Sequence, residues 1–188
     1  MIARQEAESR VTYQFTHVLI QDAIYRTLLT PRREALHQQV GEAIERRYPA
    51  HLSEWVDVLA HHWCRTARVD KAVHYLALVG EKNLRVYALV EAHACFRQVV
   101  ERIESAPRGA YDIVLADVLL HWARVHYYQK DFKGLIAVVE HSWSRLMTLD
   151  DKCRLSLLCF WLGSRMTLVG TVLRPSAYLS RHSALVKR

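Results

Sequence analysis

Apolar residues recur at steps of three and four along most of the chain, the spacing that places them on one face of an α-helix. Prolines, glycines and short polar stretches separate the periodic runs. The pattern predicts helices over about residues 17–29, 31–48, 53–66, 70–86, 89–104, 111–129, 132–147 and 150–169. Before the first helix the alternating run Val11–Phe15 predicts a strand, and a further short helix is expected after Pro175.

Only a few residues separate one predicted helix from the next, so each helix is expected to lie antiparallel to its neighbour in sequence. Helix pairs joined in this way stack into an α-solenoid, in which each pair contacts only its neighbours. The predicted fold class is therefore all-α. Within it, the helix over 31–48 is expected to bury its apolar residues Leu36, Val40, Ala43 and Ile44.

The helix pairs fit a degenerate tetratricopeptide-like repeat, which forms a right-handed α-solenoid. Such a repeat needs a small residue where two helices cross closely and a large residue that fills the space beside it. In the first unit the small residue is Gly80, and the second helix follows with Leu89, Ala92, Phe96 and Val99. The equivalent residues of a second unit are Ala123, Phe132, Leu135 and Val139. A third unit begins at Gly163 and fails at Arg174–Pro175, so the last repeat is predicted to be incomplete.

Composition favours an ordered helical protein outside the membrane. Hydrophobic residues make up 51% of the chain and charged residues 24%, with only 6 glycines and 4 prolines. The sequence has neither an apolar run of membrane-spanning length nor the apolar core of a signal peptide near Met1, so a cytoplasmic location is expected. The four cysteines are scattered without CxxC spacing, which favours reduced thiols over disulfides or a zinc site.

The net charge of +7 is concentrated at one end of the sequence. Residues 1–150 carry 19 basic and 18 acidic side chains, whereas residues 151–188 carry 7 basic and 1 acidic. A basic stripe along the body, as duplex-binding proteins have, is therefore not expected. The basic end, with Arg174, Arg181, Lys187 and Arg188, is interpreted as the solvated face of a truncated repeat, with nucleic acid or an acidic partner as the alternative.

The first half of the chain resembles bacterial STAND-type regulators, the signal-transducing ATPases that include MalT-like activators and AAA-linked class III adenylate/guanylate cyclases. The segments that carry the resemblance are YQFTHVLIQDAIYRTLLTPRREALHQQVGEAIERRYP (13–49), LAHHW (59–63) and KAVHYLALVGEKNLRVYALVEAHACFRQVVERI (71–103). Their order of Phe15, His17, Tyr25, Arg32–Arg33 and Leu36–His37 is similar to that of the family.

The resemblance implies that residues 1–50 are the end of a winged-helix-like element with linking helices, and that residues 51–188 are tetratricopeptide-like repeats. In that family such a segment follows a nucleotide-binding ATPase domain, so a covalently linked ATPase domain or another protein is the expected partner. The chain itself has neither a GxxxxGK[ST] phosphate loop nor the metal-binding aspartates of a cyclase. No catalytic residue and no cofactor are therefore predicted in it.

His17 is the one candidate for cofactor binding. Related ATPases can place a winged-helix histidine against the phosphates of bound ADP, so the resemblance implies a sensor of nucleotide state in a full-length parent. The simpler interpretation is a histidine that caps or packs at the start of a helix, because a lone histidine in this position needs no ligand.

His61, His62 and Cys64 raise the question of a metal site, since imidazole and thiolate both bind zinc. Adjacent residues on a helix point about 100° apart, so the two histidines are expected on different faces, and no metal site is predicted. Most of the five tryptophans, Trp55, Trp63, Trp122, Trp143 and Trp161, are expected in the core rather than in a peptide-binding groove.

The sequence favours a non-catalytic interaction or sensor module of a signal-transduction ATPase or cyclase-type regulator. It is expected to bind a protein partner or a small effector, and to self-associate through an uncapped last repeat. The alternative is a fragment of a DNA-binding winged-helix transcriptional regulator, which needs a basic recognition helix. Helix 31–48 has Arg32, Arg33, Arg46 and Arg47, but Glu34, Glu42 and Glu45 balance them. A stand-alone enzyme would need converging polar groups that the sequence does not display.

Overall fold

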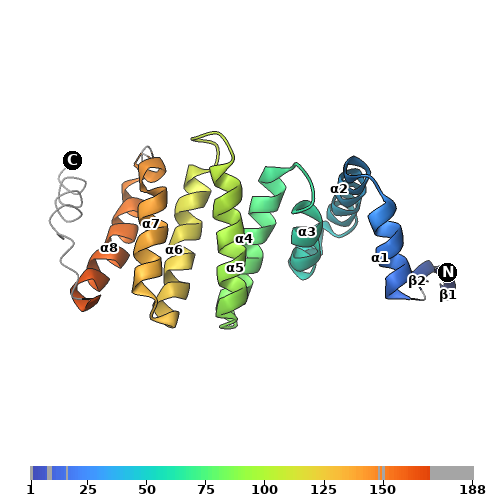
Figure 1. The fold of residues 1–188 in the computed structure, drawn as a ribbon, viewed down its shortest axis with the longest axis horizontal. Coiled ribbons are helices and arrows are strands. Elements are labelled where there is room, and N and C mark those ends of the chain that lie inside the picture. Colours follow the sequence, from blue (N-terminus) through green and yellow to red (C-terminus); the bar gives the residue numbers. More distant parts are fainter. Residues whose placement is uncertain (1, 8–9, 16, 148, 150, 170–188) are drawn as a thin grey trace.

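A computed structural model describes residues 2–7, 10–15, 17–147, 149 and 151–169. The chain is mainly helical, and its helices stand side by side in sequence order (Figure 1). The helices are α1 (Val18–Thr27), α2 (Thr30–Arg47), α3 (Val56–Trp63), α4 (Val69–Arg85), α5 (Leu89–Glu104), α6 (Asp112–Gln129), α7 (Phe132–Leu146) and α8 (Lys152–Val169). The helix expected after Pro175 lies outside the described residues.

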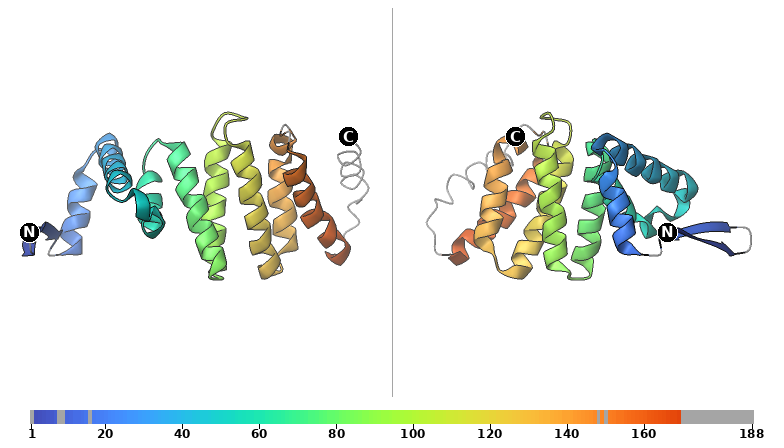
Figure 2. Two further views of the ribbon diagram at one scale, coloured as in Figure 1. Left: turned by 180° about the vertical axis from the view of Figure 1, so that it is seen from behind. Right: turned by 45° about the vertical axis from the view of Figure 1, so that its right-hand side comes forward.

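An antiparallel hairpin precedes α1 and is the non-helical part of the fold in Figure 2. Strand β2 (Arg10–Phe15) confirms the strand predicted at Val11–Phe15, and it pairs with β1 (Ile2–Ala7), which was not predicted. Ile2 lies opposite Phe15, and Ala7 lies opposite Arg10. The all-α prediction therefore holds for the described residues except at this hairpin.

Between α2 and α3 the residues Pro49–Glu54 form a short 3₁₀ helix, η1. The helix predicted from residue 53 therefore begins later, at Val56. From α3 onward each helix packs on the next one in sequence, and α4 also packs on α6, and α6 on α8. Successive helices thus form packed pairs.

Close helix crossings occur where a glycine faces an aromatic ring. A Cβ atom on Gly80 would lie 2.5 Å from Cε1 of Phe96, so α4 and α5 approach this closely because that side chain is missing. The prediction that Gly80 and Phe96 meet at a crossing is confirmed. The same arrangement joins α2 to α3, because a Cβ atom on Gly41 would lie 2.7 Å from Cε2 of Trp63.

The largest core runs from α4 to α8 and is built from leucines, valines and the rings of Phe96 and Trp122. A smaller core joins α3 to α4 around Leu59, Trp63 and Tyr75. The prediction that α2 buries Leu36, Val40, Ala43 and Ile44 is wrong, because its buried residues are His37 and Gly41. Trp63 packs against the side of α2 that carries Gly41, which leaves Val40 exposed, whereas Ile44 is half-buried against the smaller core.

A buried ion pair fixes the loop between α5 and α6. Nε of Arg145 donates to Oδ1 of Asp112 at 2.5 Å, and its Nη1 and Nη2 donate to the carbonyl oxygens of Ile103 and Pro107 at 2.7 and 2.9 Å. A single guanidinium on α7 therefore ties together the end of α5, the loop and the start of α6.

Candidate functional site

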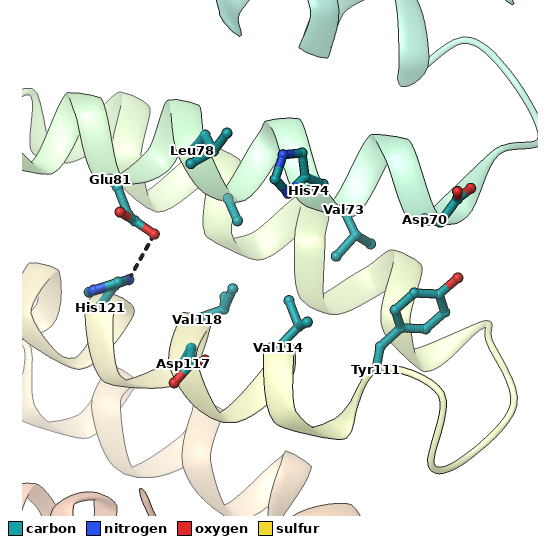
Figure 3. Close-up of a pocket in the computed structure, with 11 residues that line it drawn as sticks. Asp70, Val73, His74, Leu78, Glu81, Tyr111, Val114, Asp117, Val118 and His121 are labelled. Carbon is teal, nitrogen blue, oxygen red and sulfur yellow. Dashed lines mark ion pairs between the residues drawn. The ribbon is translucent and has the colours of Figure 1, made fainter. Parts of the chain in front are cut away.

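An apolar hollow lies between α4 and α6, and Figure 3 shows the side chains that line it. Its volume is about 230 Å³. Tyr111 and Asp70 stand at one end, and Glu81 and His121 stand at the other. Its apolar lining is Val73, Ala77, Leu78, Val114 and Val118. These positions recur at three- and four-residue steps on each helix, which brings them to one face.

A second hollow lies on the other side of α4, against η1 and α3, with a volume of about 340 Å³. His74 and Leu78 line both hollows, so the two lie on either side of one row of α4 side chains. We call them together the α4 groove. The second hollow is lined by Leu52, Ser53, Val56, His74, Tyr75, Leu78, Lys82 and Arg85.

The carboxylates at the rim of the first hollow each have a basic partner. Asp117 accepts from Nε and Nη2 of Arg154 at 2.6 and 3.1 Å. Glu81 accepts from Arg85 at 3.4 Å, and its other oxygen lies 3.6 Å from Nδ1 of His121. Paired charges of this kind frame the apolar lining without adding a large net charge to it.

Asp70, at the end of the first hollow, is held by Arg68, whose Nε and Nη2 donate to its two oxygens at 3.0 and 2.8 Å. This hydrogen-bonded guanidinium lowers the pKa of the Asp70 carboxyl. On the side of the second hollow, Lys82 is bonded to Asp57 of α3. His74, between the two hollows, is exposed and lies edge-on against the ring of Tyr75, 4.9 Å away between ring centres.

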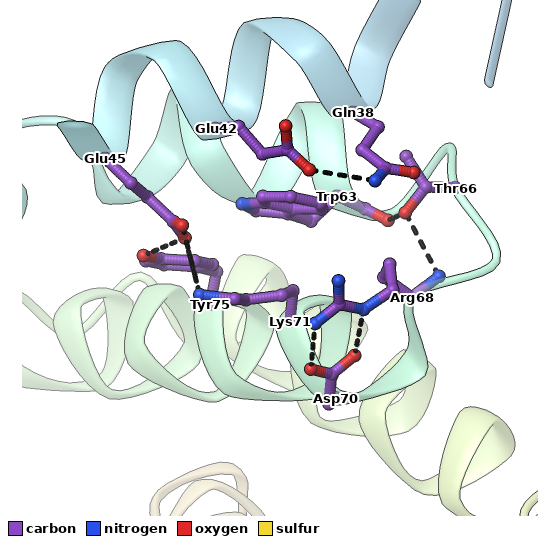
Figure 4. Close-up of polar contacts among 9 residues, drawn as sticks. All are labelled: Gln38, Glu42, Glu45, Trp63, Thr66, Arg68, Asp70, Lys71 and Tyr75. Carbon is purple, nitrogen blue, oxygen red and sulfur yellow. Dashed lines mark hydrogen bonds and ion pairs between the residues drawn. The ribbon is translucent and has the colours of Figure 1, made fainter. Parts of the chain in front are cut away.

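A polar clamp between α2 and α4 positions the wall of the second hollow (Figure 4). Glu45 of α2 accepts from Nζ of Lys71 at 3.0 Å and from the hydroxyl of Tyr75 at 2.7 Å. Nζ of Lys71 also lies 5.8 Å from the ring centre of Trp63. Burial, followed by the hydrogen bond to Glu45, raises the pKa of Tyr75, so its hydroxyl stays a donor.

The groove offers apolar contact and hydrogen bonding. Its charged groups are bonded to partners on the same helix or on neighbouring ones, so an occupant would gain mainly from covering the apolar lining. The sequence predicts partner contacts on the polar, exposed side of the first helix of each repeat, without identifying residues. The sequence signal for the groove is a row of residues at three- and four-residue steps on each of the two helices that face each other. The rows are Asp70, His74 and Leu78 on α4, and Val114, Val118 and His121 on α6.

His17, the predicted candidate for cofactor binding, is the N-cap of α1. Its Nδ1 accepts from the backbone N–H of Leu19 at 3.2 Å, and the residue is exposed. The capping interpretation is therefore what the structure shows in this chain. The nucleotide-sensing role implied by the family resemblance stays a prediction about a longer parent protein.

His61 and His62 do not separate as fully as helix geometry suggested. Their ring centres lie 5.3 Å apart, and both rings approach His37 of α2, which sequence reasoning did not bring to this place. Cys64 lies partly buried against the core, and this burial raises the pKa of its thiol. Within the described part of the chain, no three His, Cys, Asp or Glu side chains are arranged to hold a metal ion.

The tryptophans belong to the core, as predicted. Trp63 and Trp122 are buried, and Trp55, Trp143 and Trp161 pack against the two cores. The basic residues Arg174, Arg181, Lys187 and Arg188 lie outside the described residues. No helix of the described part is both long and apolar enough to cross a lipid bilayer.

Comparison with known proteins gives one distant relative. The chain is 30% identical over 93 residues to an uncharacterised protein of Rhizobium meliloti (strain 1021). The match covers 48% of this chain but only 9% of the relative, so the chain spans less than a tenth of that protein's length. No protein family matches the chain, and no solved structure matches it.

Proposed function

We propose that the chain is a non-catalytic helical-repeat module that binds a protein segment in the α4 groove. The observation that carries the proposal is the apolar lining shared by α4 and α6, framed by charged side chains that are already paired. Apolar hollows with a few polar groups at the rim are the usual form of binding sites. The packed helix pairs and the crossing of Gly80 with Phe96 favour a tetratricopeptide-like right-handed solenoid.

The proposed setting is a signal-transduction ATPase or cyclase-type regulator in the cytoplasm, in which this module senses a partner or a small effector. Two observations support this setting. Residues 13–103 resemble the family, and the matched segment makes up only 9% of its relative, which is therefore a much longer protein. Sequencing the DNA on both sides of this reading frame tests the setting. An in-frame phosphate loop upstream would support it, and an unrelated upstream gene would contradict it.

The alternative of a DNA-binding winged helix has less support. Its recognition helix would be α2, where Glu45 is held by Lys71 and Tyr75, and Gly41 lies against Trp63. One side of α2 is thus used for packing on α3 and α4. On the remaining surface, Glu34 and Glu42 accompany the arginines, which reduces the attraction to phosphates.

Peptide selection tests the groove. Peptides selected from a random library on the purified chain are expected to lose at least about tenfold in affinity for a Leu78→Glu variant, because the carboxylate would enter the apolar lining of both hollows. Val90→Glu is the matched control, since Val90 is 72% exposed on α5 and lines neither hollow. Peptides that bind both variants as tightly as the wild type would contradict the groove as the site.

Self-association is a further part of the proposal. Leu157 and Phe160 are exposed on α8, whereas Leu158 is buried in the core. Exposed apolar residues on one helix favour association with another surface. Sedimentation at increasing concentration is expected to show dimers that a Leu157→Ser/Phe160→Ser variant does not form, and a monomer at all concentrations would contradict this.

A further inference from the structure

Three histidines meet where α1, α2 and α3 come together. Between ring centres, His37 lies 5.0 Å from His62 and 6.0 Å from His61. His37 is only 8% exposed, so it is a polar side chain held inside the fold. Buried polar groups are stable only when they are hydrogen-bonded.

A line of two hydrogen bonds runs through His37. The Tyr25 hydroxyl of α1 lies 3.0 Å from its Nε2, and Nδ1 of His62 on α3 lies 2.9 Å from its Nδ1. No residue of α1 is buried, and α1 packs otherwise on β2. The line is therefore a side-chain attachment of α1 to α2 and α3.

The line depends on how many protons the two histidines carry. A neutral imidazole has one N–H and one lone pair, so two neutral rings and a hydroxyl complete both bonds. One added proton still leaves a lone pair between His37 and His62. A second proton turns both Nδ1 atoms into donors that face each other at 2.9 Å, and the bond between the rings is then lost.

The charged groups that face these rings are basic. Arg33 of α2 lies with its guanidinium 5.3 Å from the ring centre of Tyr25, and Arg65 follows α3 and donates to the carbonyl of His61. Burial is the first cause that lowers the pKa of His37, and Arg65, His61 and Arg33 add to it. Burial is also the first cause that lowers the pKa of His62, to about 4, and His37, His61 and Arg65 add to it. Burial with Arg65 lowers the pKa of His61.

We propose that the line Tyr25–His37–His62 is a proton-sensitive latch, which holds α1 on the helical array at neutral pH and releases it on acidification. Because the folded state binds these protons less readily than the unfolded chain, the attachment is complete above about pH 6.5, the ordinary value for histidine, and weakens as the pH falls towards 4. The latch does not depend on the α4 groove or on the proposed binding function.

Amide hydrogen exchange of the whole chain tests the latch. After correction for the intrinsic rates, the protection of Val18–Thr27 is expected to fall by about tenfold or more between about pH 7.5 and about pH 4.5, while that of α6 changes little. Equal protection of α1 at both pH values would overturn the proposal. So would a loss of protection in α6 as large as that in α1.

Substitution with glutamine separates the latch from other acid effects, because an amide forms hydrogen bonds but does not titrate in this range. In a His37→Gln/His62→Gln variant, α1 is expected to have the same protection at both pH values, whether it stays attached or is already released. His74→Gln, at an exposed histidine of α4, should keep the wild-type fall. A fall of wild-type size in the double variant would overturn the proposal.

Discussion

Helices α1 and α4 both have apolar residues at helical spacing, yet α4 buries seven of its residues and α1 buries none. α4 is covered by α3, α5 and α6, whereas α1 packs on β2 and is attached to α2 through Tyr25. The pattern therefore defines which face of a helix is apolar, and the neighbours decide whether that face is buried. Stability should accordingly be concentrated in α4–α7 and be low in the N-terminal segment, residues 2–47.

The largest effect is expected from Phe96→Ala in α5. Phe96 is fully buried against Gly80, and the truncation should lower the free energy of unfolding by about 3–5 kcal/mol because it leaves a cavity. Urea denaturation measures this. Val90→Ala, on the exposed side of the same helix, should cost about 0.5 kcal/mol or less, and similar losses for both variants would contradict the packing described.

Arg145→Met is expected to cost about 3 kcal/mol, because it removes the buried partner of Asp112 and the donors to the α5–α6 loop. The same denaturation experiment applies. Adding Asp112→Asn should recover part of the loss, since a neutral amide leaves no uncompensated buried charge. If the double variant had a lower free energy of unfolding than Arg145→Met alone, the result would contradict this ion pair.

Glu45→Gln should have a smaller effect, about 1–2 kcal/mol, confined to the attachment of α2. The amide weakens the bonds from Lys71 and Tyr75, so faster amide exchange is expected in α2 but not in α6. Glu42→Gln, one turn earlier, is the control, because Glu42 accepts from Gln38 of its own helix and takes no part in the clamp (Figure 4). Equal exchange in the two variants would show that the clamp does not hold α2.

The smallest effect is expected in α1. Leu19 is 67% exposed, so Leu19→Ala should change the free energy of unfolding by about 0.5 kcal/mol or less. Leu119→Ala, at a 1% exposed position of α6, should cost about 2–5 kcal/mol. If the two leucines proved equally costly, the contrast between the N-terminal segment and α4–α7 would be wrong.

Local patterns predicted the helices from α4 to α7 closely, because their apolar faces, turns and crossing at Gly80 all agree. They failed where a distant residue decides the outcome. Trp63 packs on the side of α2 that carries Gly41, so His37 is buried there instead of Leu36 and Val40. The periodicity of α2 could not indicate this, because Trp63 comes from another helix. Strand β1 was missed because only its pairing with β2 makes it a strand.

The candidate site was not located from the sequence. Partner contact on the polar, exposed sides of the first helices of the repeats stays a prediction, whereas the first hollow between α4 and α6 has an apolar lining, of which no residue was identified from the sequence. The histidine cluster was missed for a different reason. His61 and His62 share a helix, whereas their partner His37 comes from α2, 24 and 25 residues earlier, and only tertiary packing brings it there.

The proposed function is tested most directly by locating a bound peptide on the chain. Amide hydrogen exchange with and without a selected peptide should show slower exchange in α4 and α6, along residues 70–81 and 111–121 that line the first hollow, and little change in α5 and α7. Slower exchange confined to α5 and α7 would place the peptide on the other side of the array and contradict the account.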